Sequence, residues 1–440
     1  MNRLTPSDVK FASASVVDPA GKIFFYDGRV FRAIYTDKSA SFCREVFGAP
    51  WIEDSFKAGL VATWISGDIS LEGAKLVLEH QLIPFALHPA ECTSYMHWLS
   101  AKAMIRLNKV LCRHGLILKD SHPWNIMFYH GHPLFVDFGS LQKSDQLWHG
   151  WLNEFRQYYA VPIWLASKGK KELSNEYRRQ HLTGFGLKLF DSNLIQKTLF
   201  RSLMKLRKFS NRPIDFFKHI DEWLDRHPPV VAKQEDWASY QQSGNIIDPI
   251  TPTSPKHKFI YEVLASERPK KVLDCAANKG LYSELAARIG ASVIAFDYEE
   301  FCVNNCLKIA QTKQLDITPA LMDFSHPTPA SGLGLLVEGS YQRFKSDIVL
   351  ALGLAHHLCI TQGISVQIFC DICMNYASRG VIFEYVDPTD KHVVAWNRFA
   401  PSGYSLDSFT KFFSKKFPNY RYSQKLITDG INRTIAYFFK

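Results

Sequence analysis

The sequence predicts two domains of different class, an α+β domain followed by an α/β domain with a mostly parallel sheet. The chain has 440 residues, more than the roughly 100–200 residues of one ordinary domain. Strand patterns come first and helical patterns later in its first half, whereas strands and helices alternate in its last third. Residues 241–258 collect Pro, Ser, Thr and Gly, as linkers do. We therefore expect domains at residues 1–240 and 259–440, joined by that linker.

The composition excludes several classes of protein. Hydrophobic residues make up 46% of the chain, too many for a disordered protein. The net charge is +10, but only 21% of residues are charged and no long basic run occurs. This disfavours a nucleic-acid partner and predicts a mildly basic, solvated surface. No apolar run reaches the roughly 18 residues that a membrane-spanning helix needs. Oligomeric state cannot be read from these features.

The nine cysteines show no disulfide-scaffold spacing. Cys370 and Cys373 form a CxxC pair inside an apolar, helix-like stretch. A zinc site would need a second pair or nearby histidines at ligand spacing, so we expect reduced core thiols. Together with the absence of a signal-peptide pattern at the start, this predicts a cytoplasmic protein.

In the first domain the aromatic and branched residues around the Asp27-Gly28 turn predict a β-hairpin. A third strand and two long helical regions follow. In order, the expected elements are strands at residues 22–26, 29–35 and 75–80, and helices within 93–113 and 145–225.

The segment at residues 118–139, LKDSHPWNIMFYHGHPLFVDFG, carries the most specific local pattern. Asp120 is followed five residues later by Asn125, and Asp137 comes after a hairpin-like pair of strands. Phosphoryl transfer uses such a set, because one acid orients the acceptor hydroxyl while an amide and a second acid hold magnesium.

This pattern resembles the catalytic loop and metal-binding motif of the protein-kinase-like and aminoglycoside-phosphotransferase-like superfamily, over about the first 230 residues. The resemblance implies that Asp120 lies at the acceptor and that Asn125 and Asp137 bind the magnesium of Mg·ATP. Arg32 then takes the place of the ATP-binding lysine, with Glu45 as its helical partner. No Gly-rich loop precedes the second strand, and arginine does not copy the geometry of lysine. Two alternatives stay open, a degenerate kinase-like domain and an ATP-dependent phosphotransferase.

In the second domain, apolar strands alternate with helices, as in βαβ units. Such sheets bind ligands at the carboxyl ends of their strands. The expected elements are strands at residues 271–275, 292–297, 347–352 and 380–385, with helices that include 281–289 and 364–376.

The first of these strands runs into a loop of small residues, VLDCAANKG at residues 272–280. Asp274 ends the strand, and the small residues allow a ligand to approach the backbone. The next strand ends in Asp297, where an acid can accept hydrogen bonds from ribose hydroxyls. A third strand-like stretch supplies Asp323. A nicotinamide dehydrogenase fits less well, because the loop lacks GxGxxG.

These features resemble the Rossmann-like class I S-adenosylmethionine methyltransferases, although Ala276 stands where that family usually has glycine. The resemblance implies a cofactor site shared among three strand ends. On the methionine and sugar side would lie Asp274, Ala276, Asn278 and Gly280, with Asp297 at the ribose, Tyr298 at the adenine, and Asp323 with Phe324 at the adenine amino group.

Two further positions are candidates for catalysis. His356, in ALGLAHHL after the expected fourth strand, would lie near the transferred methyl group and could act as a base. Its alternative, shared with His357, is a structural role as a helix cap or polar filler. Glu384, on the expected fifth strand, could reach the same site, or could be an ion-paired structural acid.

The combination of both halves looks like a group of bacterial proteins related to the nodulation-type methyltransferases. It implies S-adenosylmethionine-dependent methyl transfer to an unidentified small-molecule or glycan acceptor, beside a degenerate kinase-like domain. The alternatives are a bifunctional kinase-methyltransferase, an ATP-dependent phosphotransferase, and a non-catalytic scaffold in which both folds are vestigial.

Overall fold

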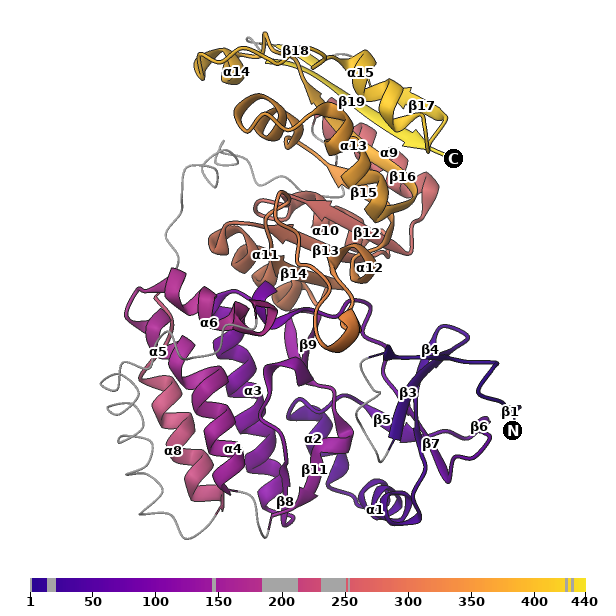
Figure 1. The fold of residues 1–440 in the computed structure, drawn as a ribbon, viewed down its shortest axis with the longest axis vertical. Helices are drawn as coiled ribbons and strands as arrows, with labels where there is room; N and C mark the ends of the chain where they lie inside the picture. Colours follow the sequence, from indigo (N-terminus) through magenta and orange to yellow (C-terminus); the bar gives the residue numbers. More distant parts are fainter. Residues whose placement is uncertain are drawn as a thin grey trace. The chain divides into compact units, whose positions relative to one another are not determined.

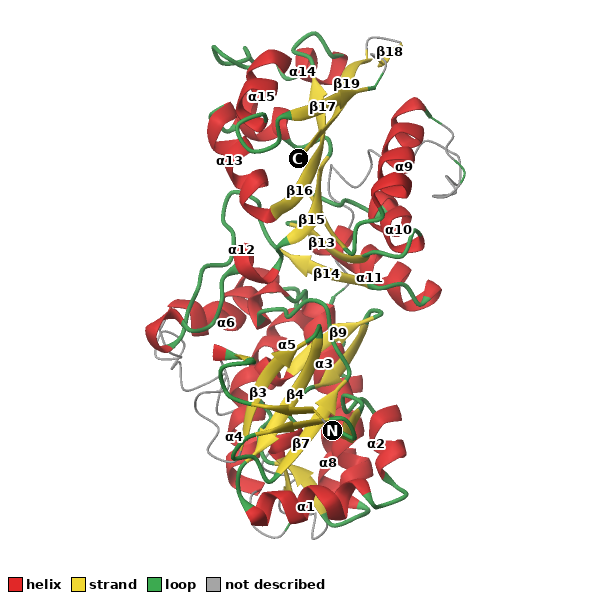
Figure 2. Cartoon of the chain, turned by 90° about the vertical axis from the view of Figure 1, so that its right-hand side faces the viewer, coloured by secondary structure: helices red, strands yellow, loops and turns green. Residues whose placement is uncertain are grey.

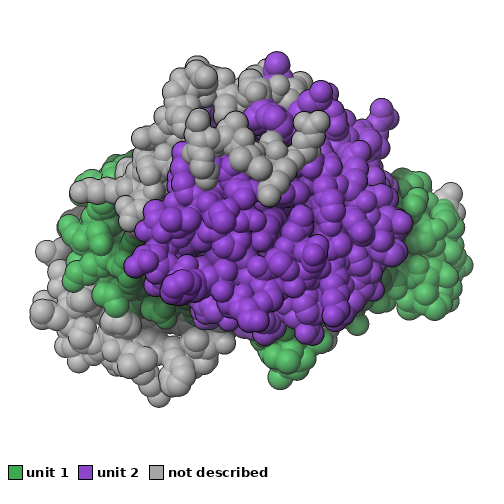
Figure 3. Space-filling model, turned by 90° about the horizontal axis from the view of Figure 1, so that it is seen from above, with its two compact units in different colours: residues 1–128, 133–230, 330–337 green, residues 129–132, 231–329, 338–440 purple. Residues whose placement is uncertain are grey.

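The computed structural model describes residues 2–13, 21–144, 148–183, 213–230, 251, 254–423, 426–428 and 431–440. The chain divides into two compact units (Figure 3). Unit 1 comprises residues 1–128, 133–230 and 330–337, and unit 2 comprises residues 129–132, 231–329 and 338–440.

The predicted linker, residues 241–258, extends too far toward the C-terminus, because Pro255 to Lys258 form the first turn of helix α9 (Pro255–Glu267). Ser254 caps this helix by accepting a hydrogen bond from the His257 N–H. A Pro at the first helical position after a Ser cap is a helix start rather than a linker. Residues 241–250, also expected in the linker, lie outside the described residues.

Unit 1 contains a five-stranded antiparallel sheet in the order β2-β3-β4-β7-β5 (Figure 1). Asp27 and Gly28 both have positive φ, the backbone of a two-residue hairpin turn, which confirms the predicted hairpin. Helix α1 (Asp37–Phe47) follows β4 directly. The strands are β2 (Lys10–Phe11), β3 (Gly21–Tyr26), β4 (Arg29–Ile34), β5 (Thr63–Ile65) and β7 (Leu76–His80).

The rest of unit 1 is mainly helical, with three small two-stranded sheets. Trp151, Phe155 and Tyr159, four residues apart in turn, are buried inside it and stack on one another. Part of the expected helical region, residues 145–147 and 184–212, lies outside the described residues. The elements are β1 (Asn2–Leu4) with β6 (Ile69–Leu71), β8 (Leu116–Leu118) with β11 (Leu141–Lys143), β9 (Ile126–Tyr129) with β10 (His132–Phe135), α2 (Ile52–Lys57), α3 (Ser94–Cys112), α4 (Trp148–Phe155), a π-helical turn (Arg156–Ala160), α5 (Val161–Ser167), α6 (Lys171–Thr183) and α8 (Pro213–Asp225).

Unit 2 is built on an eight-stranded sheet in the order β14-β13-β12-β15-β16-β19-β17, with β18 also paired to β19. The first five strands are parallel, and β19 runs antiparallel to β16. With β18 left out of the count, the seven remaining strands have the order 3-2-1-4-5-7-6, which is the strand order of the class I methyltransferase fold. The strands are β12 (Lys271–Cys275), β13 (Ser292–Asp297), β14 (Ile317–Leu321), β15 (Ser346–Ala351), β16 (Ala377–Val386), β17 (Asn419–Tyr422), β18 (Leu426–Thr428) and β19 (Ile431–Phe439).

Helices cover both faces of this sheet (Figure 2). On one face, α9, α10 and α11 share a core with the strands through residues such as Ile260, Leu285 and Ala310. On the other, Phe369 of α13 and Phe409 of α15 pack on Phe383 of β16. The helices are α10 (Leu281–Arg288), α11 (Glu300–Lys313), α12 (Ser340–Arg343), α13 (Val366–Tyr376), α14 (Lys391–Ala395) and α15 (Leu406–Phe413). Among the helices of the described ranges, none is both long and apolar enough to cross a bilayer.

Candidate active site

The acids predicted to bind a cofactor lie at one edge of the unit 2 sheet. Asp274 is near the end of β12 and Asp297 ends the neighbouring strand β13, since Asp274 pairs with Ala295. The Met322 N–H, just before Asp323, bonds to the Asp297 carbonyl at 2.9 Å. β13 and β14 are added to the sheet on one side of β12, whereas β15 and β16 are added on its other side. Ligands of open α/β sheets bind at such a reversal, outside the carboxyl ends of the strands.

The small-residue loop after β12 is held by Asp297. One carboxylate oxygen accepts the Asn278 N–H at 2.9 Å, and the other accepts the Glu299 N–H at 3.0 Å. Ala276 and Asn278 have positive φ, at 57° and 49°, so the alanine occupies the backbone conformation that favours glycine. A carboxylate has about four acceptor positions. Asp297 can therefore hold the loop and still accept bonds from ligand hydroxyls.

Asp274 is buried below this loop, with only 3% of its surface exposed. The Ser283 hydroxyl on α10 donates to its carboxylate at 2.6 Å. Burial raises the pKa of Asp274 to about 7, because removal from water penalises the charged form. Asp274 thus links the end of β12 to the first turns of α10.

This shift predicts how stability depends on pH. The unfolded carboxyl titrates near 3.9, so between about pH 4 and pH 7 the folded protein holds a proton that the unfolded chain has lost. The contribution of Asp274 to stability should therefore fall as pH rises through this window. Asp274→Asn stays neutral at every pH. Its free energy of unfolding, relative to that of the wild type, should therefore rise by up to about 4 kcal/mol between pH 4 and pH 7. Urea unfolding at each pH measures it; a constant difference between the two proteins would contradict the shift.

The residues expected near the adenine differ in their exposure to solvent. Tyr298 is exposed, and the Asp323 carboxylate accepts the Ser325 N–H at 2.8 Å. The Phe324 ring is buried against Phe369, with ring centroids 5.5 Å apart. The ring belongs to the core, so any contact of Phe324 with a ligand would fall to its backbone.

His356 is 4% exposed and stacks on Trp396, with centroids 5.4 Å apart and planes at 7°. Its Nδ1 atom has no hydrogen-bond partner among the described residues. Burial, and then the charges of His357 and Arg433, lower the pKa of His356 to about 2. The imidazole is therefore neutral and a weak base. Burial also lowers the pKa of His357, which opens a π-helical turn, to about 4.

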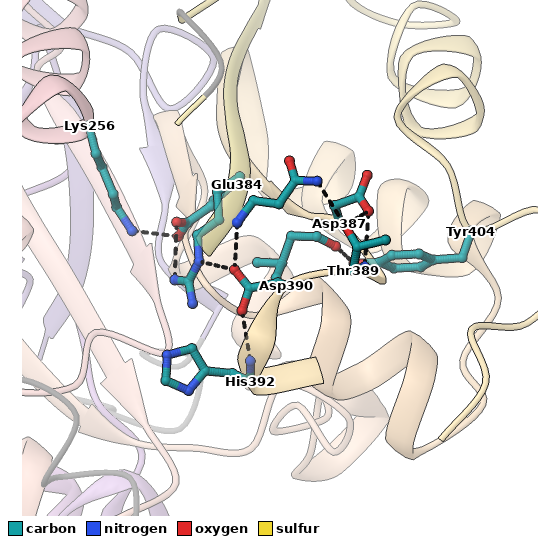
Figure 4. Close-up of polar contacts among 10 residues, drawn as sticks. Lys256, Glu384, Asp387, Thr389, Asp390, His392 and Tyr404 are labelled. Atoms are coloured by element: carbon teal, nitrogen blue, oxygen red, sulfur yellow. Dashed lines mark hydrogen bonds and ion pairs between the residues drawn. The ribbon is translucent and has the colours of Figure 1, made fainter. Parts of the chain in front are cut away.

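Glu384 is fully buried and lies between two cations (Figure 4). One carboxylate oxygen is 2.5 Å from Lys256 Nζ and the other is 3.5 Å from Arg433 Nη1. Arg433 Nε also pairs with Asp390 at 3.1 Å. Burial would raise the pKa of Glu384, but the charges of Lys256 and Arg433 outweigh it and the pKa lies below its usual range. Glu384 thus has the ion-paired arrangement that the sequence left as its alternative.

In unit 1 the structure brings Arg32, Asp120 and Asp137 together. The buried Arg32 donates from Nη2 to Asp137 at 2.8 Å. The Ser140 hydroxyl, in the turn after Asp137, accepts the Asp120 N–H at 2.9 Å, and burial raises the pKa of Asp120. Asn125 ends a short 3₁₀ turn on the same segment.

The expected pairing of Arg32 with Glu45 is wrong, because Glu45 is exposed on α1 and Asp137 receives the guanidinium instead. Within the described ranges, no group of three or more His, Cys, Asp or Glu side chains is arranged to hold a metal ion.

No family model matches the sequence. The nodulation protein NoeA of Rhizobium meliloti (strain 1021) is 24% identical over 464 aligned positions, which cover 97% of this chain and 95% of NoeA. The chain is a NoeA-like homologue. The similarity to NoeA runs through both units, so the combination of the two halves is common to both proteins.

Solved structures match part of this NoeA homologue at low scores. WbdD is 15% identical with a TM-score of 0.31, over 41% of this chain and 38% of WbdD. EvdMO1 is 13% identical with a TM-score of 0.31, over 42% and 41% of the two chains. The magnesium protoporphyrin IX methyltransferase of Synechocystis PCC 6803 is 14% identical with a TM-score of 0.32, over 46% and 91%. The fold assignment rests on the strand order.

Three charged residues of the site were missed by sequence reasoning. Lys256 was assigned to the linker because Pro and Ser precede it, and Arg433 lies in a strand that carried no recognised motif. Asp390 closes the stretch FEYVDPTD, and its position before a short helix could have identified it as a cap. Nothing local in the sequence shows that Lys256 and Arg433 meet Glu384, since the pairs are 128 and 49 positions apart.

Proposed function

We propose that this protein is an S-adenosylmethionine-dependent methyltransferase whose reaction takes place in unit 2. The observation that carries the proposal is the Asp297 carboxylate. It ends the strand next to β12, organises the small-residue loop through the Asn278 N–H, and keeps acceptor positions for a ribose. The acid is at the place where a nucleoside binds a sheet of this order.

Other residues fit the same ligand. Gly280, with φ of 85°, opens α10 beside the loop, where a side chain would restrict the approach of a ligand to the backbone. Ala276 and Asn278 belong to the same loop, and Asp274 lies near the end of the strand before it. We assign Tyr298 and Asp323, with the backbone of Phe324, to the adenine side.

When bound, S-adenosylmethionine supplies an electrophilic methyl group on sulfonium. The protein's part is then to hold the acceptor in line with that group. His356 is our candidate contact for the acceptor, because its buried Nδ1 has no partner among the described residues and buried polar atoms normally have one. We assign Glu384 to positioning through its ion pairs rather than to proton transfer.

Asp297→Asn is expected to weaken binding of S-adenosylhomocysteine by roughly 10- to 100-fold, the value of charge-assisted hydrogen bonds. Titration calorimetry measures this without an acceptor. The matched control is Asp316→Asn, an acid before β14 at the opposite edge of the same sheet, bonded to Ser292 at 2.5 Å. The control should bind as the wild type does. Equal affinity of Asp297→Asn and the wild type would refute the ribose assignment.

For unit 1 we propose a kinase-like fold. Its strand order and the place of α1 between β4 and β5 are those of a protein-kinase amino-terminal lobe. The Arg32 to Asp137 ion pair supports a degenerate site, because the proposed magnesium ligand already neutralises a guanidinium. Asn125 would be the second ligand and Asp120 the acid at an acceptor.

A degenerate site predicts that purified protein with Mg·ATP releases no more phosphate than its Asp137→Ala variant. Radiolabelled γ-phosphate measures this directly. Phosphate release or transfer by the wild type that Asp137→Ala abolishes would favour the alternative, a bifunctional kinase-methyltransferase or an ATP-dependent phosphotransferase.

We further propose a small-molecule or glycan acceptor and, from the similarity to NoeA, a role related to nodulation. All nine cysteines are free, which supports a reducing compartment such as the cytoplasm.

A further inference from the structure

The methyl donor of the proposed function carries a carboxylate at its methionine end, and the loop residues assigned above include no cation. Asp274 and Asp297 are acids, and Ala276, Asn278 and Gly280 are uncharged. A buried carboxylate requires a cation or several hydrogen-bond donors. Lys279, the one cation within residues 272–280, acts electrostatically on Cys302 of α11. A second basic group is therefore to be sought on the other side of the site, toward β15 and β16.

Lys256 is placed to be that group. It lies in the first turn of α9, on the face of the sheet that also carries α10. Its ammonium is 2.5 Å from Glu384 of β16 and 5.4 Å from the Tyr282 ring centre at the start of α10. The ammonium therefore lies between Glu384 of β16 (Figure 4) and the start of the helix that follows the loop.

The Lys256 and Glu384 pair lies near the reversal of the strand order, where open α/β sheets bind their ligands. β15 lies between β12 and β16 in the sheet, and the order reverses between β12 and β15. Gly353 follows β15, and a Cβ added there would lie 3.6 Å from the Glu384 carboxylate. Lys256 also acts electrostatically on Asp274, whose pKa it lowers against the larger effect of burial. The ammonium thus contacts Glu384 near the carboxyl end of β16, and its charge acts on Asp274 near the end of β12.

Lys256 keeps donors for a second partner. An ammonium has three N–H bonds, and Glu384 takes one of them. Only 22% of the Lys256 side chain is exposed, so its remaining N–H groups lie in a partly desolvated setting where a charged partner is bound more strongly than in water.

We propose that Lys256 binds the carboxylate of the methionine moiety of S-adenosylmethionine, bridging it to Glu384. This assignment rests on the proposed function and adds to it the residue that recognises the amino-acid end of the donor. Glu384 is then a positioning residue, because it holds the ammonium at the site instead of touching the ligand.

The test compares two ligands that differ in one group. S-adenosylhomocysteine carries the carboxylate, and S-adenosyl-3-thiopropylamine is the same molecule without it. Calorimetry on the full-length protein should show that the wild type prefers S-adenosylhomocysteine by roughly 10- to 100-fold. Lys256→Met should lose this preference while binding the amine as the wild type does, and Lys256→Arg should keep much of it.

Lys258→Met is the matched control, since Lys258 is exposed on the same helix and should leave the preference unchanged. Retained affinity for the amine shows that Lys256→Met is folded. Should Lys256→Met fail to fold, the double variant Lys256→Met/Glu384→Gln removes the unbalanced acid and is expected to show no preference.

A preference for S-adenosylhomocysteine that survives in Lys256→Met, or in that double variant, overturns the assignment. Loss of the preference in Lys258→Met would overturn it as well. If the wild type binds neither ligand, the proposed function itself fails, and the assignment with it.

Discussion

Glu384→Gln is expected to lower the free energy of unfolding by about 3–5 kcal/mol, because it leaves cations without their buried counter-charge. Glu384 is fully buried between Lys256 and Arg433. Removing one partner of a buried ion pair costs more than the pair itself contributes, since the remaining charge stays desolvated. Urea-induced unfolding measures the change.

The matched control is Glu267→Gln, also in unit 2. Glu267 pairs with Arg379 at 2.7 Å, but both side chains are partly exposed, so the loss should stay below about 1 kcal/mol. Adding Lys256→Met to Glu384→Gln should restore part of the stability, because it removes one unpaired cation. If the two Glu→Gln variants are equally stable, the buried network described above does not hold.

Gly280→Ala should destabilise the protein by roughly 2–5 kcal/mol. Its φ of 85° is left-handed, which costs an ordinary residue about 1–2 kcal/mol. The added Cβ would also lie 2.8 Å from Cys306 Sγ on α11, and such overpacking costs about 1–3 kcal/mol more. The same unfolding assay applies.

Gly290→Ala separates the two costs, because Gly290 also has positive φ but no atom lies within 4 Å of its added Cβ. It should show only the backbone cost. Adding Cys306→Ala to Gly280→Ala should recover the steric part. If Gly280→Ala and Gly290→Ala lose the same free energy of unfolding, α11 shifts to accommodate the extra methyl group and the expected steric cost is absent.

The sequence predicted the elements best where burial on both faces produces continuous apolar runs. Strands were expected at residues 271–275 and 292–297, and both are observed with those bounds. The strand expected at 380–385 spans Ala377–Val386. It is longer because Ala377 pairs with Ser346 of β15 and Val386 with Arg433 of β19, pairings that depend on strands distant in the sequence.

The candidate site was predicted unevenly for the same reason. Acids that end strands, such as Asp274 and Asp297, are identified by a local pattern of apolar run and loop. The state of His356 is not, because its low pKa follows from burial and from Arg433, which is far away in the chain. Whether Arg32 pairs with Glu45 or with Asp137 depends likewise on how β4, α1 and the turn after β10 pack.

The position of β19 also constrains how unit 2 is made. β19 is the last strand of its sheet in chain order, yet it lies inside the sheet, between β16 and β17. During synthesis, every other strand of the sheet leaves the ribosome before it. Until then the apolar edge of β16 has no partner, and such an edge promotes association between chains. Until Ile431–Phe439 has emerged and docked, the growing polypeptide therefore presents a strand edge at which another chain can pair.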